Sequence, residues 1–216
     1  MKPLACVTTK LGNKIELLGK SGNNNILIIG VFHGDEPQGK YLIDAYLKNN
    51  GLKSNLLFIP CLNPDGMNED KRTNANNVDL NRNFPTQNWG QNKGENATCD
   101  DCTTNYFGGI APASEIETQF VINIIEKYSP KRILTIHSPY KVVNYDGPAK
   151  ELAEKISNII GYPAEGSIGY PTPGSFGTYC GVERNIPTIT LELDETSPVE
   201  SLCSPIFQVF DDLLFE

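Results

Sequence analysis

The chain contains only two histidines, and their surroundings indicate metal chemistry. The first opens the sequence His33-Gly34-Asp35-Glu36, and the second, His137, follows an apolar run. A histidine and a glutamate three residues apart can bind one ion from a single turn, and a distant histidine at a strand end can supply the third protein ligand of a catalytic zinc. The fourth position then stays open for water. Considered singly, however, His33 fits an ordinary turn residue and His137 a hydrogen-bonded histidine of the core.

Further polar motifs lie between and beyond the two histidines. In chain order they are Asn63-Pro64-Asp65-Gly66, Arg72-Thr73-Asn74, Asp79-Leu80-Asn81-Arg82-Asn83-Phe84-Pro85 and Leu191-Glu192-Leu193. Together with the two histidines and Glu36, these motifs and their order resemble the zinc carboxypeptidases of the carboxypeptidase A type over residues 26–195. Several independent motifs in the right order are more specific than any short motif alone.

The resemblance implies which side chains perform the chemistry. His33, Glu36 and His137 would hold one zinc ion per chain, and Glu192 would act as general base and acid, taking a proton from water and returning it to the leaving amine. An unpaired carboxylate on an apolar strand is costly to bury, which makes a purely structural Glu192 a weak alternative. Arg72 would stabilise the oxyanion. Without the motif, Arg72 could equally be a solvated loop arginine.

Three more residues receive a role from the same resemblance. Asn81 and Arg82 match the pair that grips the terminal carboxylate of the substrate, a task that suits the planar guanidinium fork. Asp79 matches the carboxylate that accepts the free ring N–H of His33 and so orients the imidazole. A free carboxylate on the substrate is therefore expected.

The loop 168–177 resembles one group within this family more than the others. It is similar to the equivalent loop of bacterial zinc peptidases that cleave the γ-D-glutamyl to meso-diaminopimelate bond of muropeptides. Tyr170 falls near the mobile substrate-capping tyrosine of the wider family, although it could also be a packed loop residue. The chain departs from the family pattern at Asn77, where a glycine usually precedes Val-Asp. Asparagine tolerates positive φ, so the turn should be preserved.

The expected function is zinc-dependent hydrolysis of a peptide-like amide next to a free carboxylate, most simply in a muropeptide. One alternative is an N-acyl amino acid deacylase of the aspartoacylase or succinylglutamate desuccinylase type. The other is a zinc-binding module without catalysis. Such a module would have no need of Glu192.

The segments that carry these residues alternate between strand and helix. Apolar runs predict buried strands at 26–32, 55–62, 133–136 and 187–193. Helical spacing and end signals predict helices at 37–51, 115–128, 148–160 and 199–214. This alternation predicts a three-layer α/β domain with a largely parallel sheet, whose ligands collect at the carboxyl ends of the strands. The family resemblance implies a mixed sheet of about eight strands with helices on both sides.

Two local features complete the prediction of elements. Residues 63–110 are rich in polar residues and glycine and lack periodicity, which predicts a long, ordered and functional loop. Ser114 and Glu117 have the spacing of a capping box at the start of the helix that follows.

Six cysteines are distributed along the chain. Cys6, Cys61, Cys180 and Cys203 lie in or beside apolar segments, where a reduced cysteine behaves as a small hydrophobe. Cys99 and Cys102 have the spacing of half a structural zinc site or a redox pair, but no second such pair completes the site. We therefore expect a loop disulfide or free thiols there.

Composition limits the remaining possibilities. A chain of 216 residues that is 39% hydrophobic is most simply one catalytic domain, residues 1–216. A net charge of -8, with 18 basic residues spread along the chain, argues against a nucleic-acid partner. Polar residues interrupt the N-terminal segment, so we expect a cytoplasmic protein, or a periplasmic one if a leader has been removed. Apolar runs fall short of the roughly 18 residues that span a bilayer, so no membrane partner is expected.

Overall fold

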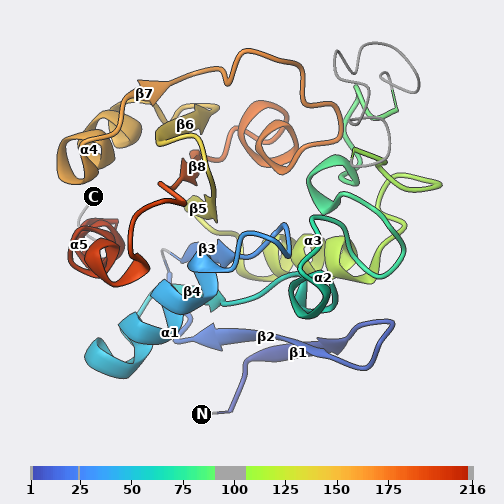
Figure 1. Ribbon diagram of the computed structural model, residues 1–216, viewed down its shortest axis with the longest axis horizontal. Coiled ribbons are helices and arrows are strands. Elements are labelled where there is room, and N and C mark those ends of the chain that lie inside the picture. The colour runs from blue at the N-terminus through green and yellow to red at the C-terminus, as the bar shows by residue number, and fades with distance from the viewer. Residues whose placement is uncertain (1, 24, 91–105, 214–216) are drawn as a thin grey trace.

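A mixed eight-stranded sheet forms the centre of the fold (Figure 1). The computed structural model describes residues 2–23, 25–90 and 106–213. The sheet order is β1-β2-β4-β3-β5-β8-β6-β7, with parallel pairing from β4 through β8 and antiparallel pairing of β6 with β8. The strands are β1 (Ala5–Thr8), β2 (Lys14–Gly19), β3 (Ile26–Gly30), β4 (Leu56–Ile59), β5 (Arg132–His137), β6 (Val142–Asp146), β7 (Ala164–Glu165) and β8 (Thr188–Glu192).

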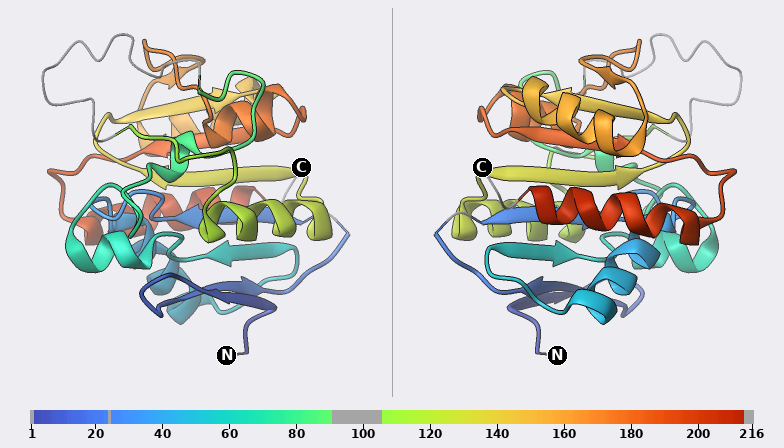
Figure 2. Two further views of the ribbon diagram at one scale, coloured as in Figure 1. Left: turned by 90° about the vertical axis from the view of Figure 1, so that its right-hand side faces the viewer. Right: turned by 90° about the vertical axis from the view of Figure 1, so that its left-hand side faces the viewer.

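Helices cover both faces of this sheet (Figure 2). Along β3, Ile26 and Ile28 pack into one core while Leu27 and Ile29 pack into the other, because successive side chains of a strand point to opposite faces. The first core is completed by α1 (Gln38–Asn50), α4 (Lys150–Ile160) and α5 (Cys203–Asp212), and the second by α3 (Ile116–Tyr128). The predicted three-layer α/β fold with a mixed sheet is confirmed.

Parallel strands bring the predicted site residues to one edge of the sheet. His33 follows β3, His137 ends β5, and Glu192 ends β8 directly opposite His137 in the register. Strand β6 runs the other way, so that its first residue, Val142, pairs with Glu192 and its last, Asp146, with Thr188. The four strands predicted from apolar runs are all present. β1, β2, β6 and β7 were not predicted.

The segment 63–110 contains more regular structure than predicted. Asn63 caps the short helix α2 (Pro64–Glu69) by accepting a hydrogen bond from the backbone N–H of Gly66 at 2.9 Å, and η1 (Leu80–Arg82) is a single 3₁₀ turn. The prediction of a loop throughout this segment is therefore wrong, because elements of one or two turns are too short to show periodicity. Cys99 and Cys102 lie outside the described residues. The other four cysteines are free.

The capping box predicted at Ser114 is wrong. Helix α3 begins at Ile116, and its N-cap, Glu115, makes no side-chain cap bond. Ser114 instead donates its hydroxyl to the Glu115 carboxylate at 2.6 Å and accepts from Asn83 at 3.0 Å. These tertiary contacts use the hydroxyl that local capping would need.

The remaining helices were predicted with mixed success. Helix α4 ends at Gly161 in the left-handed conformation, as expected of a glycine C-cap. The helix predicted over 199–214 is divided into a 3₁₀ turn, η3 (Val199–Leu202), and α5, and Pro205 lies in the first turn of α5, where its missing N–H is tolerated. Helix η2 (Thr178–Val182) was not predicted. Among the described residues, no helix is both long and apolar enough to cross a membrane.

Candidate active site

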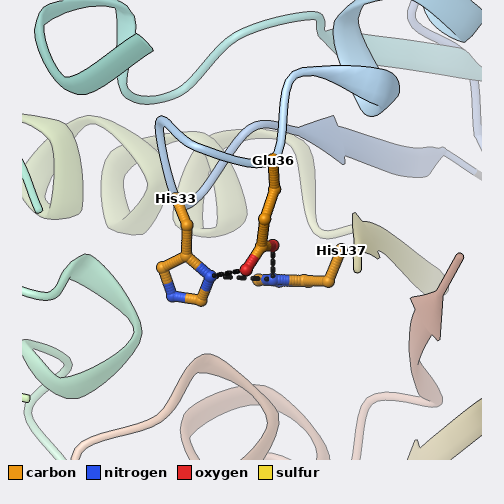
Figure 3. Close-up of side chains that lie close together, drawn as sticks. All are labelled: His33, Glu36 and His137. Carbon is orange, nitrogen blue, oxygen red and sulfur yellow. Dashed lines mark hydrogen bonds and ion pairs between the residues drawn. The ribbon is translucent and has the colours of Figure 1, made fainter. Parts of the chain in front are cut away.

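Three side chains meet at the edge of the sheet with geometry suited to a metal ion (Figure 3). The Glu36 carboxylate lies 2.7 Å from Nδ1 of His33 and 2.9 Å from Nδ1 of His137, and the two Nδ1 atoms are 3.3 Å apart. All three residues are buried. Tetrahedral coordination with bonds of about 2.0–2.1 Å places ligand atoms about 3.3 Å apart, which matches the separation of the two Nδ1 atoms. The Glu36 oxygens lie at hydrogen-bond distance from both rings, so the three residues supply a donor set of the kind that binds zinc.

The turn that carries His33 is held in an unusual conformation. Val31, between β3 and the turn, has φ of 54°, which is rare for a β-branched residue. Such a conformation costs on the order of 1–3 kcal/mol and persists only where the surroundings enforce it. Val31 is fully buried, and its carbonyl accepts from the backbone N–H of Asn63 at 2.9 Å.

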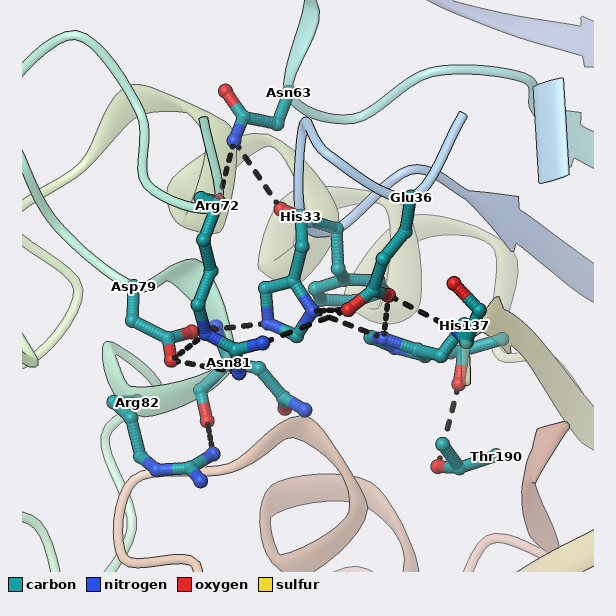
Figure 4. Close-up of polar contacts among 12 residues, drawn as sticks. His33, Glu36, Asn63, Arg72, Asp79, Asn81, Arg82, His137 and Thr190 are labelled. Atoms are coloured by element: carbon teal, nitrogen blue, oxygen red, sulfur yellow. Dashed lines mark hydrogen bonds and ion pairs between the residues drawn. The ribbon is translucent and has the colours of Figure 1, made fainter. Parts of the chain in front are cut away.

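Asn63 joins this turn to the segment of Arg72. Its side-chain amide donates to the carbonyls of Phe32 at 3.3 Å and Arg72 at 3.2 Å (Figure 4). The residue is fully buried. Sequence reasoning placed Asn63 near the site but missed this bridging function, since a sequence does not show which backbone groups need a partner.

Asp79 lies behind His33, as predicted. Its carboxylate is 3.2 Å from Nε2 of His33, accepts from Nε of Arg72 at 3.1 Å, and caps η1 by accepting from the backbone N–H of Asn81 at 2.8 Å. Burial opposes ionisation of Asp79, but the charges of Arg72 and His33 hold its pKa well below the usual range. Asp79 can therefore orient the His33 ring as an ionised acceptor.

Arg72 links Asp79 to the metal ligands. Its guanidinium lies 3.0 Å from Asp79 and 3.5 Å from Glu36, and it also lies over the ring of Tyr106 at 5.1 Å. The side chain lines the same cavity as the metal ligands. Arg72 is thus positioned by its neighbours and is not a solvated loop residue.

Glu192 faces the metal ligands from the neighbouring strand. It is buried, and its Oε2 atom has no hydrogen-bond partner among the described residues. Burial raises the pKa of Glu192, and the nearby His137 opposes that effect. The nearby carboxylate of Asp194 is engaged by Lys141 at 2.7 Å and by Thr196 at 2.6 Å, so it is less suited to act as a base.

Asn81 and Arg82 lie at the side of the cavity opposite β8. The Asn81 side-chain oxygen accepts from the backbone N–H of Phe176 at 2.9 Å, which leaves the NH2 end of the amide for a ligand. Arg82 donates to the carbonyl of Asn81 at 2.7 Å and lies over Tyr106 at 5.4 Å. Tyr170 is partly exposed at the cavity, where burial and the neighbouring Tyr140 raise its pKa to about 12.

These groups line one cavity of about 370 Å³. Of the predicted site residues, only Asp79 does not line it. Sequence reasoning missed several lining residues, among them Tyr106 and two residues of β6, Asn144 and Asp146. Tyr106 had no motif to mark it, and β6 was not recognised as a strand.

The turn at Asn77 has the conformation that the sequence predicted. Its φ is 57°, in the left-handed region that asparagine tolerates. The departure from the family glycine at this position therefore leaves the approach to Asp79 intact.

Known proteins resemble this chain in sequence and in fold. Residues 4–154 match the zinc carboxypeptidase family. Murein peptide amidase A of Escherichia coli (strain K12) is 33% identical over 182 residues, which cover 81% of this chain and 73% of that protein. Murein peptide amidase A of Vibrio campbellii is 34% identical over 184 residues, which cover 81% and 71%.

Solved structures agree with these sequence relatives. The crystal structure of murein-tripeptide amidase MpaA from Escherichia coli O157 superposes with a TM-score of 0.80 at 28% identity, covering 99% of this chain and 93% of that one. Carboxypeptidase A from Helicoverpa armigera superposes with a TM-score of 0.72 at 17% identity, covering 98% and 67%. At that identity the second likeness supports the fold alone.

Proposed function

Because the chain belongs to the zinc carboxypeptidase family and is therefore a hydrolase, we propose that it cleaves the γ-D-glutamyl to meso-diaminopimelate amide bond of muropeptides. The proposal treats residues 1–216 as one catalytic domain. The observation that carries it is the single cavity lined by the three metal-type ligands, by Glu192 and by Arg82. The names of the murein peptide amidase relatives support the choice of substrate. Since the relatives are enzymes, the non-catalytic module considered above is set aside.

His33, Glu36 and His137 would hold the zinc ion. When bound, zinc lowers the pKa of water toward neutrality and polarises a carbonyl. Asp79 would keep the His33 ring in position by accepting its Nε2 proton, since the two atoms lie 3.2 Å apart. The strained turn at Val31 would hold His33 and Glu36 at their places before substrate arrives.

Glu192 would handle the proton that hydrolysis moves. Glu192 lines the same cavity as the metal ligands and its Oε2 has no hydrogen-bond partner among the described residues, so it can take a proton from water and deliver it to the departing amine nitrogen. The negative charge that develops on the carbonyl oxygen needs a fixed donor. Arg72 would supply it, because Asp79 and Glu36 hold its guanidinium at the cavity.

Arg82 and Asn81 would bind the carboxylate beside the scissile bond. The guanidinium offers two parallel donors and the Asn81 amide a third, which suits a planar carboxylate. Tyr170, partly exposed across the same cavity, would cover the bound substrate. These groups would select a substrate that ends in a free carboxylate next to the cleaved bond.

Purified protein incubated with L-Ala-γ-D-Glu-meso-diaminopimelate should release free diaminopimelate, measured by mass spectrometry. N-acetylaspartate and N-succinylglutamate are assayed beside it, because the deacylase alternative predicts their hydrolysis instead. A higher kcat/KM on either N-acyl amino acid would refute the proposal.

The metal assignment has a separate test that does not use activity. Zinc per chain is measured by elemental analysis in the native protein and in His137→Ala. Loss of one of three ligands should lower occupancy by about tenfold or more. Undiminished zinc in His137→Ala would show that the ion binds elsewhere.

A further inference from the structure

Tyr106 contacts both arginines of the cavity. Its ring centroid lies 5.1 Å from the guanidinium carbon of Arg72 and 5.4 Å from that of Arg82, and all three side chains line the cavity. A guanidinium within about 6 Å of a ring centroid is attracted by the negative face of the ring. One aromatic side chain therefore acts on the two cationic groups to which the proposed function gives different tasks.

Arg82 depends most on this contact, because it is buried without an ionic partner. Within the described part of the chain, no carboxylate forms an ion pair with Arg82, and its guanidinium donates to the carbonyl of Asn81 at 2.7 Å. A buried charge is costly unless other contacts compensate. The face of Tyr106 supplies such a contact without occupying N–H groups as a carboxylate would, so the remaining donors of Arg82 stay available to a ligand.

Arg72 differs because two carboxylates also hold it. Its guanidinium lies 3.0 Å from Asp79 and 3.5 Å from Glu36. The like charges of Arg72 and Arg82 repel each other, and their shared attraction to the ring opposes that repulsion. The ring therefore helps to keep two guanidinium groups in one cavity.

The backbone beside Tyr106 is fixed to the turn that carries Arg82. The carbonyl of Phe107 accepts from the backbone N–H of Asp79, the N-cap of η1, at 2.9 Å. Gly108 lies so close to this turn that a Cβ atom there would be 2.5 Å from the carbonyl oxygen of Arg82. The segment that carries the ring is thus packed on the turn, and the position of the ring relative to Arg82 is set before a ligand binds.

We propose that Tyr106 is a positioning residue that orients Arg72 and Arg82 together, so that oxyanion stabilisation and carboxylate binding both depend on one ring. This inference rests on the proposed function, because the tasks of the two arginines come from it. Tyr106 acts through the arginines and not through its hydroxyl. Loss of the ring should therefore impair both tasks, whereas loss of one arginine impairs the task of that arginine.

Two substitutions separate the ring of Tyr106 from its hydroxyl. Tyr106→Leu keeps an apolar side chain and removes the ring, while Tyr106→Phe keeps the ring and removes the hydroxyl. With zinc-loaded protein and L-Ala-γ-D-Glu-meso-diaminopimelate, Tyr106→Leu should raise KM and lower kcat, with a loss of kcat/KM of about fivefold to thirtyfold, the scale of a cation–π contact. Tyr106→Phe should stay within about threefold of the native protein, since a phenyl face also attracts cations.

A double-mutant cycle measures whether the ring acts through Arg82. In the Arg82→Ala background, Tyr106→Leu should change KM by no more than about twofold, because the contact that it removes is already gone. A matched peptide with an amide in place of the carboxylate beside the cleaved bond should behave likewise with native Arg82. On both, kcat should still fall, since the contact with Arg72 is lost in either case.

Phe107→Leu is the matched control. Phe107 is the next residue in the same segment, its aromatic side chain is 42% exposed against 40% for Tyr106, and it does not line the cavity. The substitution keeps the backbone carbonyl that accepts from Asp79, so KM and kcat should stay within about twofold of the native values. Zinc per chain, measured by elemental analysis, should be the same in all variants, which excludes metal loss as the cause.

A measurement without catalysis separates this inference from the proposed function. Urea denaturation of the zinc-loaded native protein, Tyr106→Leu, Arg82→Ala and the double variant gives the coupling between ring and arginine, expected at about twofold to thirtyfold in the unfolding equilibrium constant. If the native protein does not hydrolyse the peptide, the proposed function fails, while a coupling of this size still supports Tyr106 as the residue that holds Arg82.

Three results would overturn the inference. One is the absence of coupling between Tyr106 and Arg82 in the denaturation cycle, whatever the activity. Another is an equal loss of kcat/KM in Tyr106→Phe and Tyr106→Leu, because the hydroxyl would then be the group that acts. The third is an undiminished effect of Tyr106→Leu on KM in the Arg82→Ala background, because the ring would then act on the substrate by another route.

Discussion

Asp79 and Asp146 are two carboxylates of one site with opposite surroundings. Asp79 accepts from Arg72 and from the backbone of Asn81 and lies 3.2 Å from the His33 ring, and its pKa is held well below the usual range. Asp146 has only burial acting on it, which raises its pKa to about 6.

The difference separates a carboxylate that its neighbours keep ionised from one whose ionised form burial disfavours. Around Asp79 every charge is balanced within the protein, so the metal ligands and Arg72 keep their geometry before substrate binds. Around Asp146 burial acts alone, so the ionised form of the carboxylate is disfavoured. Four substitutions test this contrast.

Asp79→Asn should have the largest effect, on stability. Removing the charge takes from Arg72 and His33 the fully buried one of the two carboxylates that they contact, and breaking a buried ion pair costs about 3–5 kcal/mol. The free energy of unfolding is measured by urea denaturation with a chelator present, so that metal binding does not contribute. The control is Asp44→Asn, which breaks the exposed pair with Lys40 and should cost about 1 kcal/mol or less. Equal losses in both variants would refute the charge balance inferred around Asp79.

Glu192→Gln should lower kcat on the muropeptide roughly 100-fold or more, because it keeps the shape of the side chain and removes the base. Zinc content should stay unchanged, since Glu192 is not among the ligands. If activity stays within about threefold of the native value, well below that scale, another group is the base. Glu195, the exposed carboxylate of the same cavity, would be examined next.

Arg82→Ala should lower kcat/KM for a free-carboxylate substrate by about tenfold to a hundredfold, the value of a charge-assisted hydrogen bond. A matched substrate with an amide cap has no carboxylate to hold and should be hardly affected. Measuring both substrates with both proteins gives a double difference. Equal losses would mean that Arg82 has a structural role, and the carboxypeptidase activity would have to be restated as a general amidase activity.

Asp146→Asn should stabilise the protein at neutral pH. The folded protein keeps the Asp146 proton up to about pH 6, whereas the unfolded chain releases it near the ordinary aspartate value of 3.8, so the native free energy of unfolding falls as pH rises between these values. Asparagine has no proton to lose. Thermal unfolding at several pH values should therefore show a variant that matches the native protein near pH 4 and exceeds it by about 1–3 kcal/mol at pH 7. A variant that is less stable at pH 7 would show that Asp146 has a structural partner.

The central strands could be predicted because both of their faces are buried. β3 reads Ile26-Leu27-Ile28-Ile29, and a short apolar run of this kind, rich in β-branched residues, is typical of a strand covered on both faces. Strand β1, at the edge of the sheet, and its neighbour β2 carry mixed, half-exposed sequences, so their pairing depends on neighbours that the sequence does not identify. The capping box at Ser114 failed for a similar reason, since the contact with Asn83 comes from 31 residues away in the chain.

The catalytic end of the site could be predicted because its residues occur in compact motifs at strand ends. His33 with Glu36, Asn81 with Arg82, and the two strand-end residues His137 and Glu192 are of this kind, and all line the cavity. The wall of the cavity that β6 provides could not be predicted. Strand β6 contains Asn144 and Asp146, and asparagine and aspartate are depleted in strands, so the sequence did not predict a strand here. The same two residues line the cavity.

Because β6 runs antiparallel to β8, its residues lie at regular distances from Glu192 along one wall of the cavity. Each second residue of that strand projects onto the same face, and two residues correspond to about 7 Å of depth. Residue 142 pairs with Glu192, and residues 144 and 146 follow it on the same face at increasing distance from Glu192. Residues 144 and 146 can therefore be exchanged to reshape this wall of the cavity in steps of about 7 Å, while the metal ligands on β5 and in the turn after β3 keep their places.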